Sequence, residues 1–83
     1  MSYQRLQAAR EKTVGSKQTV KALKKELAKL VFVAENADKH VIDPILAACR
    51  EKKVPVVKVD SMKNLGKACG IKVECASAAI IEE

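Results

Sequence analysis

The run Leu27-Ala-Lys-Leu-Val-Phe-Val-Ala34 decides the fold of this chain, because it is apolar, β-branched and of strand length. A second run of the same kind, Val54-Pro-Val-Val-Lys-Val59, follows it after a helix-length segment. Strands buried on both faces of a sheet show such continuous apolar runs. We therefore expect both runs to be interior strands of one central sheet.

The segment between the two runs predicts a helix. Asp43 and Pro44 are typical of an N-cap and a first helical residue, because proline lacks the amide that would have no partner there. The sequence thus predicts a turn over residues 38–42 and a helix from Pro44 to about Lys53. Its buried stripe would hold Ile45, Leu46 and Cys49. A strand, a crossover helix and a second strand favour a right-handed α/β arrangement.

The flanking segments alternate between helix and strand in the same way. Residues 3–12 show the apolar spacing of a short helix, and Thr13 and Val14 are expected to be briefly extended. Ser16 is expected to cap a helix that ends near Glu26. Ser61 is expected to cap a short helix that Gly70 terminates, and 76–81 is expected to be a third long strand. Gly66 inside that short helix predicts close packing or the close approach of a partner.

We therefore predict one α/β domain over residues 1–83, a three-layer α/β/α sandwich around a small mixed central sheet. The 83 residues are 48% apolar and 31% charged, which excludes intrinsic disorder and a second core. No apolar run approaches the ~18 residues that would span a bilayer. Without a signal-like stretch near the first residues, we expect a cytoplasmic protein that does not bind membranes. A chain with a single core is most simply a monomer.

Catalytic chemistry has little support in the sequence. His40 is the only histidine, and no phosphate-binding or dinucleotide-binding glycine pattern is present. The cysteines Cys49, Cys69 and Cys75 lack the spacing of a metal site, and we expect them to be reduced core thiols. A small enzyme with a cysteine nucleophile is a remote alternative, since no neighbouring base is apparent. We expect no metal, no cofactor and no enzymatic activity.

The positive charge is concentrated in the first third of the chain. Residues 1–30 hold eight basic and two acidic residues, whereas 31–83 hold eight of each and are neutral overall. Such a region indicates a polyanion partner, usually nucleic acid, although a solvated helix face explains it about as well. Only Tyr3 and Phe32 are aromatic, so recognition by base stacking on aromatic platforms is excluded.

Two segments could supply the recognition instead. In Gly15–Lys21 a glycine admits close approach to a helix N-terminus that attracts phosphate. There Lys17 and Lys21 add charge, and Gln18 can read base edges. An ordinary helix start explains this segment equally well. The segment Ile71–Cys75 is either the beginning of the last strand or a loop that exposes aliphatic side chains to an unstacked nucleotide.

Several separated motifs together resemble the ribosomal protein L-seven-Ae family, and within it the short bacterial YbxF-like kink-turn-binding proteins. The resemblance covers residues 3 to 82. It rests on Gly15-Ser-Lys-Gln-Thr-Val-Lys21, Leu30-Val-Phe-Val-Ala-Glu-Asn-Ala-Asp38, Val54-Pro-Val-Val-Lys-Val59, Ser61 with Leu65-Gly66, Ala68-Cys-Gly70 and Ala79-Ile-Ile81.

The resemblance implies a non-catalytic α/β/α sandwich that binds kink-turn RNA, a sharply bent duplex with tandem sheared G·A pairs beside a short bulge. Ribosomal RNA, a regulatory RNA and the ribosome itself are the partners that it implies. The matching positions imply contacts at the G·A pairs from one segment and contacts at the bulge from two others. The implied RNA-binding residues are Gly15, Ser16, Lys17, Gln18, Thr19 and Lys21, then Asp38, then Ile71, Lys72, Val73 and Glu74.

Two positions depart from the wider family pattern. Lys17-Gln18 stands where archaeal and eukaryotic members carry Asn-Glu, although the bacterial members share the Lys-Gln pair. This exchange favours phosphate attraction over acceptance of a guanine amino group. Glu74 replaces a proline found in many members. The alternatives to kink-turn recognition are a general basic RNA-binding or ribosome-associated protein, and a protein-interaction subunit whose basic face docks an acidic partner.

Overall fold

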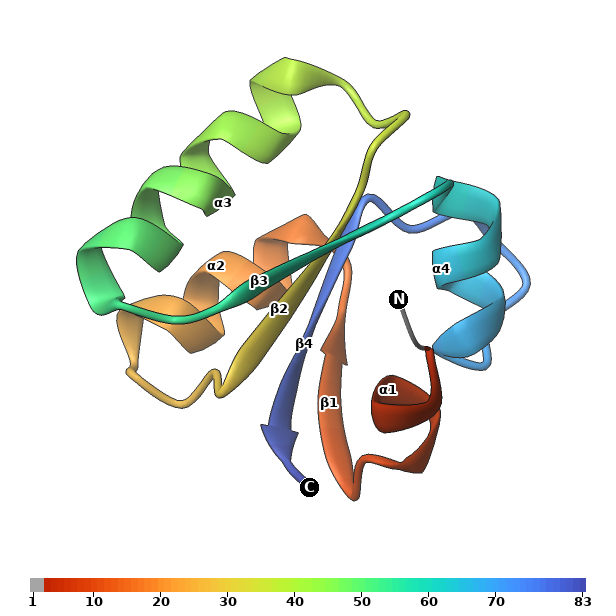
Figure 1. The fold of residues 1–83 in the computed structure, drawn as a ribbon, viewed down its shortest axis with the longest axis horizontal. Coiled ribbons are helices and arrows are strands. Elements are labelled where there is room, and N and C mark those ends of the chain that lie inside the picture. Colours follow the sequence, from red (N-terminus) through yellow and green to blue (C-terminus); the bar gives the residue numbers. More distant parts are fainter. Residues whose placement is uncertain (1–2) are drawn as a thin grey trace.

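The computed structural model describes residues 3–83, so Met1 and Ser2 of the predicted domain lie outside it. The helices are α1 (Gln4–Ala8), α2 (Ser16–Lys24), α3 (Lys39–Lys52) and α4 (Met62–Ala68). The strands are β1 (Glu11–Val14), β2 (Leu30–Ala34), β3 (Val56–Val59) and β4 (Ser77–Glu82). They form one mixed sheet in the order β1-β4-β2-β3 (Figure 1).

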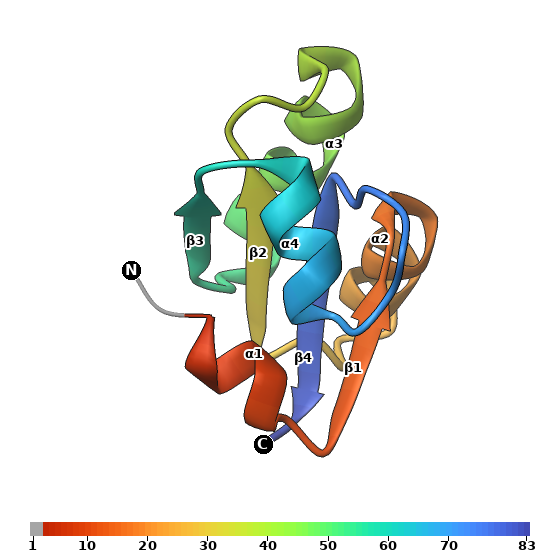
Figure 2. The ribbon, with the colours of Figure 1, turned by 90° about the vertical axis from the view of Figure 1, so that its right-hand side faces the viewer.

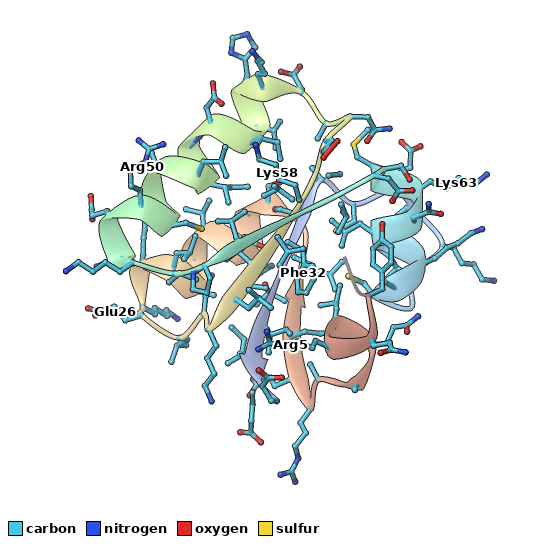
Figure 3. The ribbon with its side chains drawn as sticks, viewed as in Figure 1. Arg5, Glu26, Phe32, Arg50, Lys58 and Lys63 are labelled. Atoms are coloured by element: carbon cyan, nitrogen blue, oxygen red, sulfur yellow. The ribbon has the colours of Figure 1, made fainter. Side chains whose placement is uncertain are left out.

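The sheet separates two layers of helices, as the α/β/α prediction requires. In Figure 2, α1 and α4 lie in front of the sheet, with α2 and α3 behind it. Successive side chains of β2 point to opposite faces of the sheet and so pack against both helical layers. Phe32 packs with Leu6 and Leu65 on the α1/α4 side, whereas Val31 and Val33 pack against the α2/α3 side. The side-chain view places Phe32 near the middle of the molecule (Figure 3). The predicted sandwich is thus confirmed.

Strand pairing explains why two of the predictions are wrong; in addition, β2 begins at Leu30 and not at Leu27. The helix expected over 3–12 stops at Ala8, because Glu11–Val14 pairs antiparallel with β4 along the edge of the sheet. The second apolar run was expected to be interior, yet β3 pairs only with β2 and forms the other edge. Three of its four residues are half-buried or exposed. Pro55, which lacks an amide for a ladder, fits an edge position.

The start of α3 also differs from the prediction. The helix begins at Lys39 rather than Pro44, since the Asp38 carboxylate accepts a hydrogen bond from the His40 amide at 2.8 Å. This cap competes successfully with the Asp43-Pro44 pair, and Pro44 lies inside the helix. The turn expected over 38–42 is therefore the first turn of α3. The predicted end is confirmed, because Lys53 is the left-handed C-cap residue.

Both predicted ends of α4 are confirmed. Ser61 caps α4 through a 3.1 Å bond from the Asn64 amide to its hydroxyl, and Gly70 has a φ of +80° just after the helix. The segment 71–76 contains no strand, so the loop alternative is the correct one. All three cysteines are free and buried.

Candidate nucleic-acid interface

The sheet topology gathers the predicted site segments at one end of the molecule. β1, β2 and β3 all finish at the end where β4 begins, since Ser77 at the start of β4 pairs with Val33 of β2. Val14, the last residue of β1, pairs one position further along β4. In Figure 2 this is the upper end. The segments that meet there are Gly15 with the start of α2, the β2–α3 loop over 35–38, and the loop over 71–76.

The start of α2 is built around Gly15. This residue is the N-cap, and its φ of +95° with ψ of 156° is a conformation that glycine tolerates and other residues rarely adopt. Its amide donates to the Ser77 carbonyl oxygen at 2.9 Å, which fixes α2 to the first residue of β4. Nothing lies within 4 Å of the position of a Cβ at Gly15. The backbone is therefore open to a ligand.

Ser16 does not cap α2 as expected, because it is already the first helical residue. Its hydroxyl instead accepts a 3.1 Å hydrogen bond from the buried Ser77 hydroxyl. No side chain caps the helix, and its first turn contains no acidic residue. The first amides of a helix have no carbonyl partner within it, so this end of α2 retains hydrogen-bond donors for an anion.

The side chains of the first turns of α2 divide into exposed and buried groups. Lys17, Gln18 and Lys21 are exposed. Thr19 is completely buried, and its hydroxyl lies 3.4 Å from the Thr13 hydroxyl of β1. Of the residues that the resemblance implies here, Thr19 therefore offers no side-chain surface and instead supports the helix.

The ion pairs show which of the N-terminal basic residues remain available. Arg5 pairs with Glu83 and Arg10 with Glu82, both at the end of the sheet opposite Gly15. The Lys12 amino group donates to the Leu6 carbonyl oxygen at 3.1 Å. Within residues 3–83, four lysines of α2 and its C-cap have no ion-pair partner: Lys17, Lys21, Lys24 and Lys25. The unpaired positive charge of this third of the chain thus concentrates along α2.

An apolar strip accompanies this charge. Val20 of α2 and Val41 and Pro44 of α3 line a shallow groove between the two helices. Lys17, Lys21 and Lys24 line the same groove. Lys21 and Lys25 also line a second depression beside Gln18. The exposed face of α2 therefore combines cations with aliphatic surface.

The loop over 71–74 is held rigidly against α4. The Ile71 amide donates to the Gly66 carbonyl oxygen and the Cys75 amide to the Met62 carbonyl oxygen, both at 3.1 Å. A Cβ at Gly66 would lie only 2.2 Å from the Val73 carbonyl oxygen. The close packing predicted at Gly66 is thus confirmed, and the neighbour is this loop.

The loop presents one aliphatic side chain to solvent. Val73 is 69% exposed, whereas Ile71 is half-buried against the α1/α4 core. Lys72 and Glu74 are exposed on either side of Val73. Lys63 on the outer face of α4 lines a hollow with this loop and projects away from the molecule in Figure 3. An exposed valine on a fixed backbone, beside lysines, suits contact with a nucleotide base.

Asp38 reaches this end of the sheet from the β2–α3 loop. It is exposed, and its carboxylate caps α3. The neighbouring Asn36 was not predicted as a site residue. Its side-chain oxygen accepts a 2.8 Å bond from the Met62 amide, which ties the loop to the start of α4. The turn-like Glu-Asn-Ala-Asp composition was the only sequence signal for this residue.

The connection between β3 and α4 is held by hydrogen bonds to Asp60. The Tyr3 hydroxyl donates to Asp60 at 2.6 Å, and the Asn64 amide group donates to the same carboxylate at 2.9 Å. Burial and the adjacent carboxylate raise the pKa of Tyr3 to about 12. The two hydrogen bonds lower the pKa of Asp60. This pair fastens the β3–α4 connection, which lies at the same end of the sheet as the interface.

Among residues 3–83, no group of three or more histidine, cysteine or acidic residues is placed to hold a metal ion. Within the same residues, no helix is long and apolar enough to cross a membrane.

Comparison with known protein families identifies the family of this chain. Residues 2–83 match the model of the Ribosomal protein L7Ae/L30e/S12e/Gadd45 family. The chain belongs to this family. Family members resemble it along nearly their whole length. An RNA-binding protein of Geobacillus sp. (strain WCH70) is 54% identical over 81 residues, which is 98% of this chain and 99% of that protein.

A second relative is the RNA-binding protein YbxF of Geobacillus stearothermophilus, which is 51% identical over the same coverage. Among solved structures, the Giardia lamblia 15.5kD RNA binding protein superimposes with a TM-score of 0.85 at 27% identity. That comparison covers 98% of this chain and 68% of the Giardia protein. The family resemblance of the sequence and the α/β architecture are thereby confirmed.

Proposed function

We propose that this protein is a non-catalytic RNA-binding protein that recognises and stabilises kink-turn RNA. The observation that carries the proposal is the gathering, at one end of the sheet, of an uncapped cationic helix start and a rigid loop that exposes Val73. The relatives at about half identity are named RNA-binding proteins, which supports RNA as the partner.

The two halves of this surface suit the two halves of a kink-turn. The open backbone at Gly15 and the free amides of α2 would meet phosphates at the G·A pairs. Lys17, Gln18 and Lys21 are exposed beside them and would contact the groove. On the other side, Val73 would pack on the unstacked nucleotide of the bulge, since apolar contact needs no base-specific hydrogen bond.

Asp38 and the remaining loop residues would complete the contact. Asp38 lies on the loop that Asn36 ties to α4, so its carboxylate can reach the bulge while it caps α3. Lys72 would add a phosphate contact beside Val73. The Lys17-Gln18 pair stands where archaeal and eukaryotic members carry Asn-Glu, so it adds one positive charge and removes one negative charge, which strengthens the contribution of phosphate attraction to binding.

The protein would act by population shift. A free kink-turn exchanges between extended and bent forms, and a ligand moves that equilibrium by the difference between its affinities for the two forms. Residues 1–83 would act as one monomeric, cytoplasmic RNA-binding domain. Ribosomal RNA or a regulatory RNA that carries the bend would be its target.

Amide chemical-shift mapping tests the assignment of the surface. On titration with a kink-turn RNA, we expect the largest shifts in residues 15–21, 36–38 and 71–74. The ion-paired end near Arg5 and Arg10 serves as the internal control, because its amides should shift little. Shifts centred on that end would contradict the assigned surface. If the kink-turn RNA causes no shifts and an acidic protein binds instead, the protein-interaction alternative is favoured.

A further inference from the structure

Ser77 is a buried polar residue where three segments of the interface end of the molecule meet. It is the first residue of β4 and has no exposed surface. Its backbone pairs with Val33 of β2. Its carbonyl oxygen accepts hydrogen bonds from the Gly15 amide at 2.9 Å and from the Cys75 thiol at 2.8 Å. Neighbouring segments therefore fix the position of Ser77.

The Ser77 side chain has one hydrogen-bond partner within residues 3–83. Its hydroxyl donates to the Ser16 hydroxyl oxygen at 3.1 Å, although the two residues are 61 positions apart in the chain. The reverse direction would leave the buried Ser77 hydrogen without an acceptor, because this hydroxyl makes no other hydrogen bond in the described chain. A buried donor without a partner is costly, so burial favours the direction observed.

This direction leaves a hydrogen-bond donor on Ser16. A serine hydroxyl has one hydrogen and two lone pairs. Because Ser16 uses a lone pair to accept from Ser77, its own hydrogen is available, and within residues 3–83 it bonds to no acceptor. Ser16 is half-buried and lines the groove that Lys17 and Lys21 also line. A hydroxyl that accepts one hydrogen bond is polarised and becomes a stronger donor in the next.

We propose that Ser77 is a positioning residue for RNA binding, whose buried hydroxyl holds the Ser16 hydroxyl as a donor to a phosphate oxygen of the RNA backbone. Phosphate oxygens accept hydrogen bonds, so they require a hydroxyl in the donor orientation. The first amides of α2 and the exposed Lys17 supply further donors there. This role rests on the proposed function, and Ser77 performs it without touching RNA.

The benefit of Ser77 comes from orientation before binding. Without the Ser77 hydroxyl, the Ser16 side chain would exchange among three staggered positions. RNA would then have to select one of them, which lowers the affinity by a factor of about three. Removal of the Ser16 hydroxyl loses a hydrogen bond to a charged group, which lowers the affinity roughly tenfold. The loss at Ser77 should therefore be the smaller one.

A double-mutant cycle with a kink-turn RNA tests the role of Ser77. In gel-shift titrations, Ser16→Ala should weaken binding roughly tenfold and Ser77→Ala about threefold. Because Ser77 acts through Ser16, adding Ser77→Ala to Ser16→Ala should cause no further loss. A merely structural effect of Ser77→Ala would weaken binding equally in both backgrounds. Losses that multiply, or an unchanged affinity of Ser77→Ala, would overturn the proposal.

Thr13→Val is the matched control. The Thr13 hydroxyl of β1 lies 3.4 Å from the Thr19 hydroxyl of α2, so this change also removes a hydroxyl that joins α2 to the sheet. It leaves the bond between Ser77 and Ser16 in place. Thr13→Val should change the affinity less than Ser77→Ala does, and by the same factor with and without Ser16→Ala. An equal loss that also disappears in Ser16→Ala would overturn the specific role of Ser77.

The orientation of Ser16 is measurable without RNA. Three-bond couplings between its Hα and Hβ protons should show one side-chain orientation in the wild type and averaged values in Ser77→Ala. Averaged couplings in the wild type would overturn the proposal, and this measurement stands even if Ser77→Ala does not fold. If the wild type binds no kink-turn RNA, the proposed function fails, while the couplings still decide whether Ser77 holds Ser16.

Discussion

Replacing Gly66 by alanine is expected to displace the 71–74 loop and to lower stability. The new Cβ would lie 2.2 Å from the Val73 carbonyl oxygen. Since a carbon and such an oxygen approach to roughly 3.3 Å at closest, the loop backbone must move by about 1 Å. Overpacking of this kind costs about 1 to 3 kcal/mol, whereas alanine regains about 1 kcal/mol through its helix propensity. We expect a net loss of about 1 kcal/mol, which lowers Tm by about 4 to 8 °C in a domain of this size.

Thermal unfolding followed by circular dichroism measures this loss, and a kink-turn titration of the same variant measures the effect of moving Val73. Lys67→Ala is the control for stability, because it changes the neighbouring exposed residue of α4 with little change in helix propensity. A Gly66→Ala variant that is as stable as the wild type, or more stable, would refute the packing of the loop against Gly66.

Three further predictions follow from the same structure. Lys21→Ala should weaken kink-turn binding by about 1 to 3 kcal/mol through loss of a base contact. Arg10→Ala should leave binding nearly unchanged, because Arg10 is ion-paired with Glu82 at the opposite end of the sheet. Equal losses for the two variants in gel-shift titrations would contradict the assigned surface. Val73→Ala should reduce RNA affinity about fivefold, near 1 kcal/mol, and leave unfolding within about 0.5 kcal/mol, and unchanged affinity would remove Val73 from the interface. Because the pKa of Tyr3 is raised to about 12, the folded state keeps a proton that the unfolded state loses above pH 10; stability should therefore fall as pH rises from about 10 to 12, and Tyr3→Phe, in denaturant titrations, should lack that component.

The sequence predicted those features of the fold that local chemistry decides. The part of the predicted run that forms β2, Leu30–Ala34, is buried along its whole length, whereas Leu27 precedes the strand and is 50% exposed. Ser61 caps the start of α4 and Gly70 follows its end, as their residue types suggest. The two errors in strand assignment have a common cause. Whether Glu11–Val14 joins a sheet, and whether the β3 run is central or at an edge, depends on partners distant in the chain.

The candidate site was predictable in its parts but not in its assembly. The pattern of Gly15–Lys21 indicated an exposed cationic helix start, and Gly66 indicated a close neighbour. Nothing local indicated that Thr19 would be fully buried. Likewise, Asn36 and Ser77 act through partners 26 and 61 residues away, and such hydrogen bonds follow only from the folded topology.

The central claim is that the protein recognises the bend of a kink-turn rather than RNA charge alone. The most direct measurement is calorimetric titration, at two salt concentrations, against a kink-turn RNA and against the same RNA with its tandem G·A pairs replaced by Watson–Crick pairs. The account predicts tight binding to the first RNA and much weaker binding to the second at both salt concentrations. Equal affinity for the two, with a steep dependence on salt, would contradict the account and show a general polyanion binder.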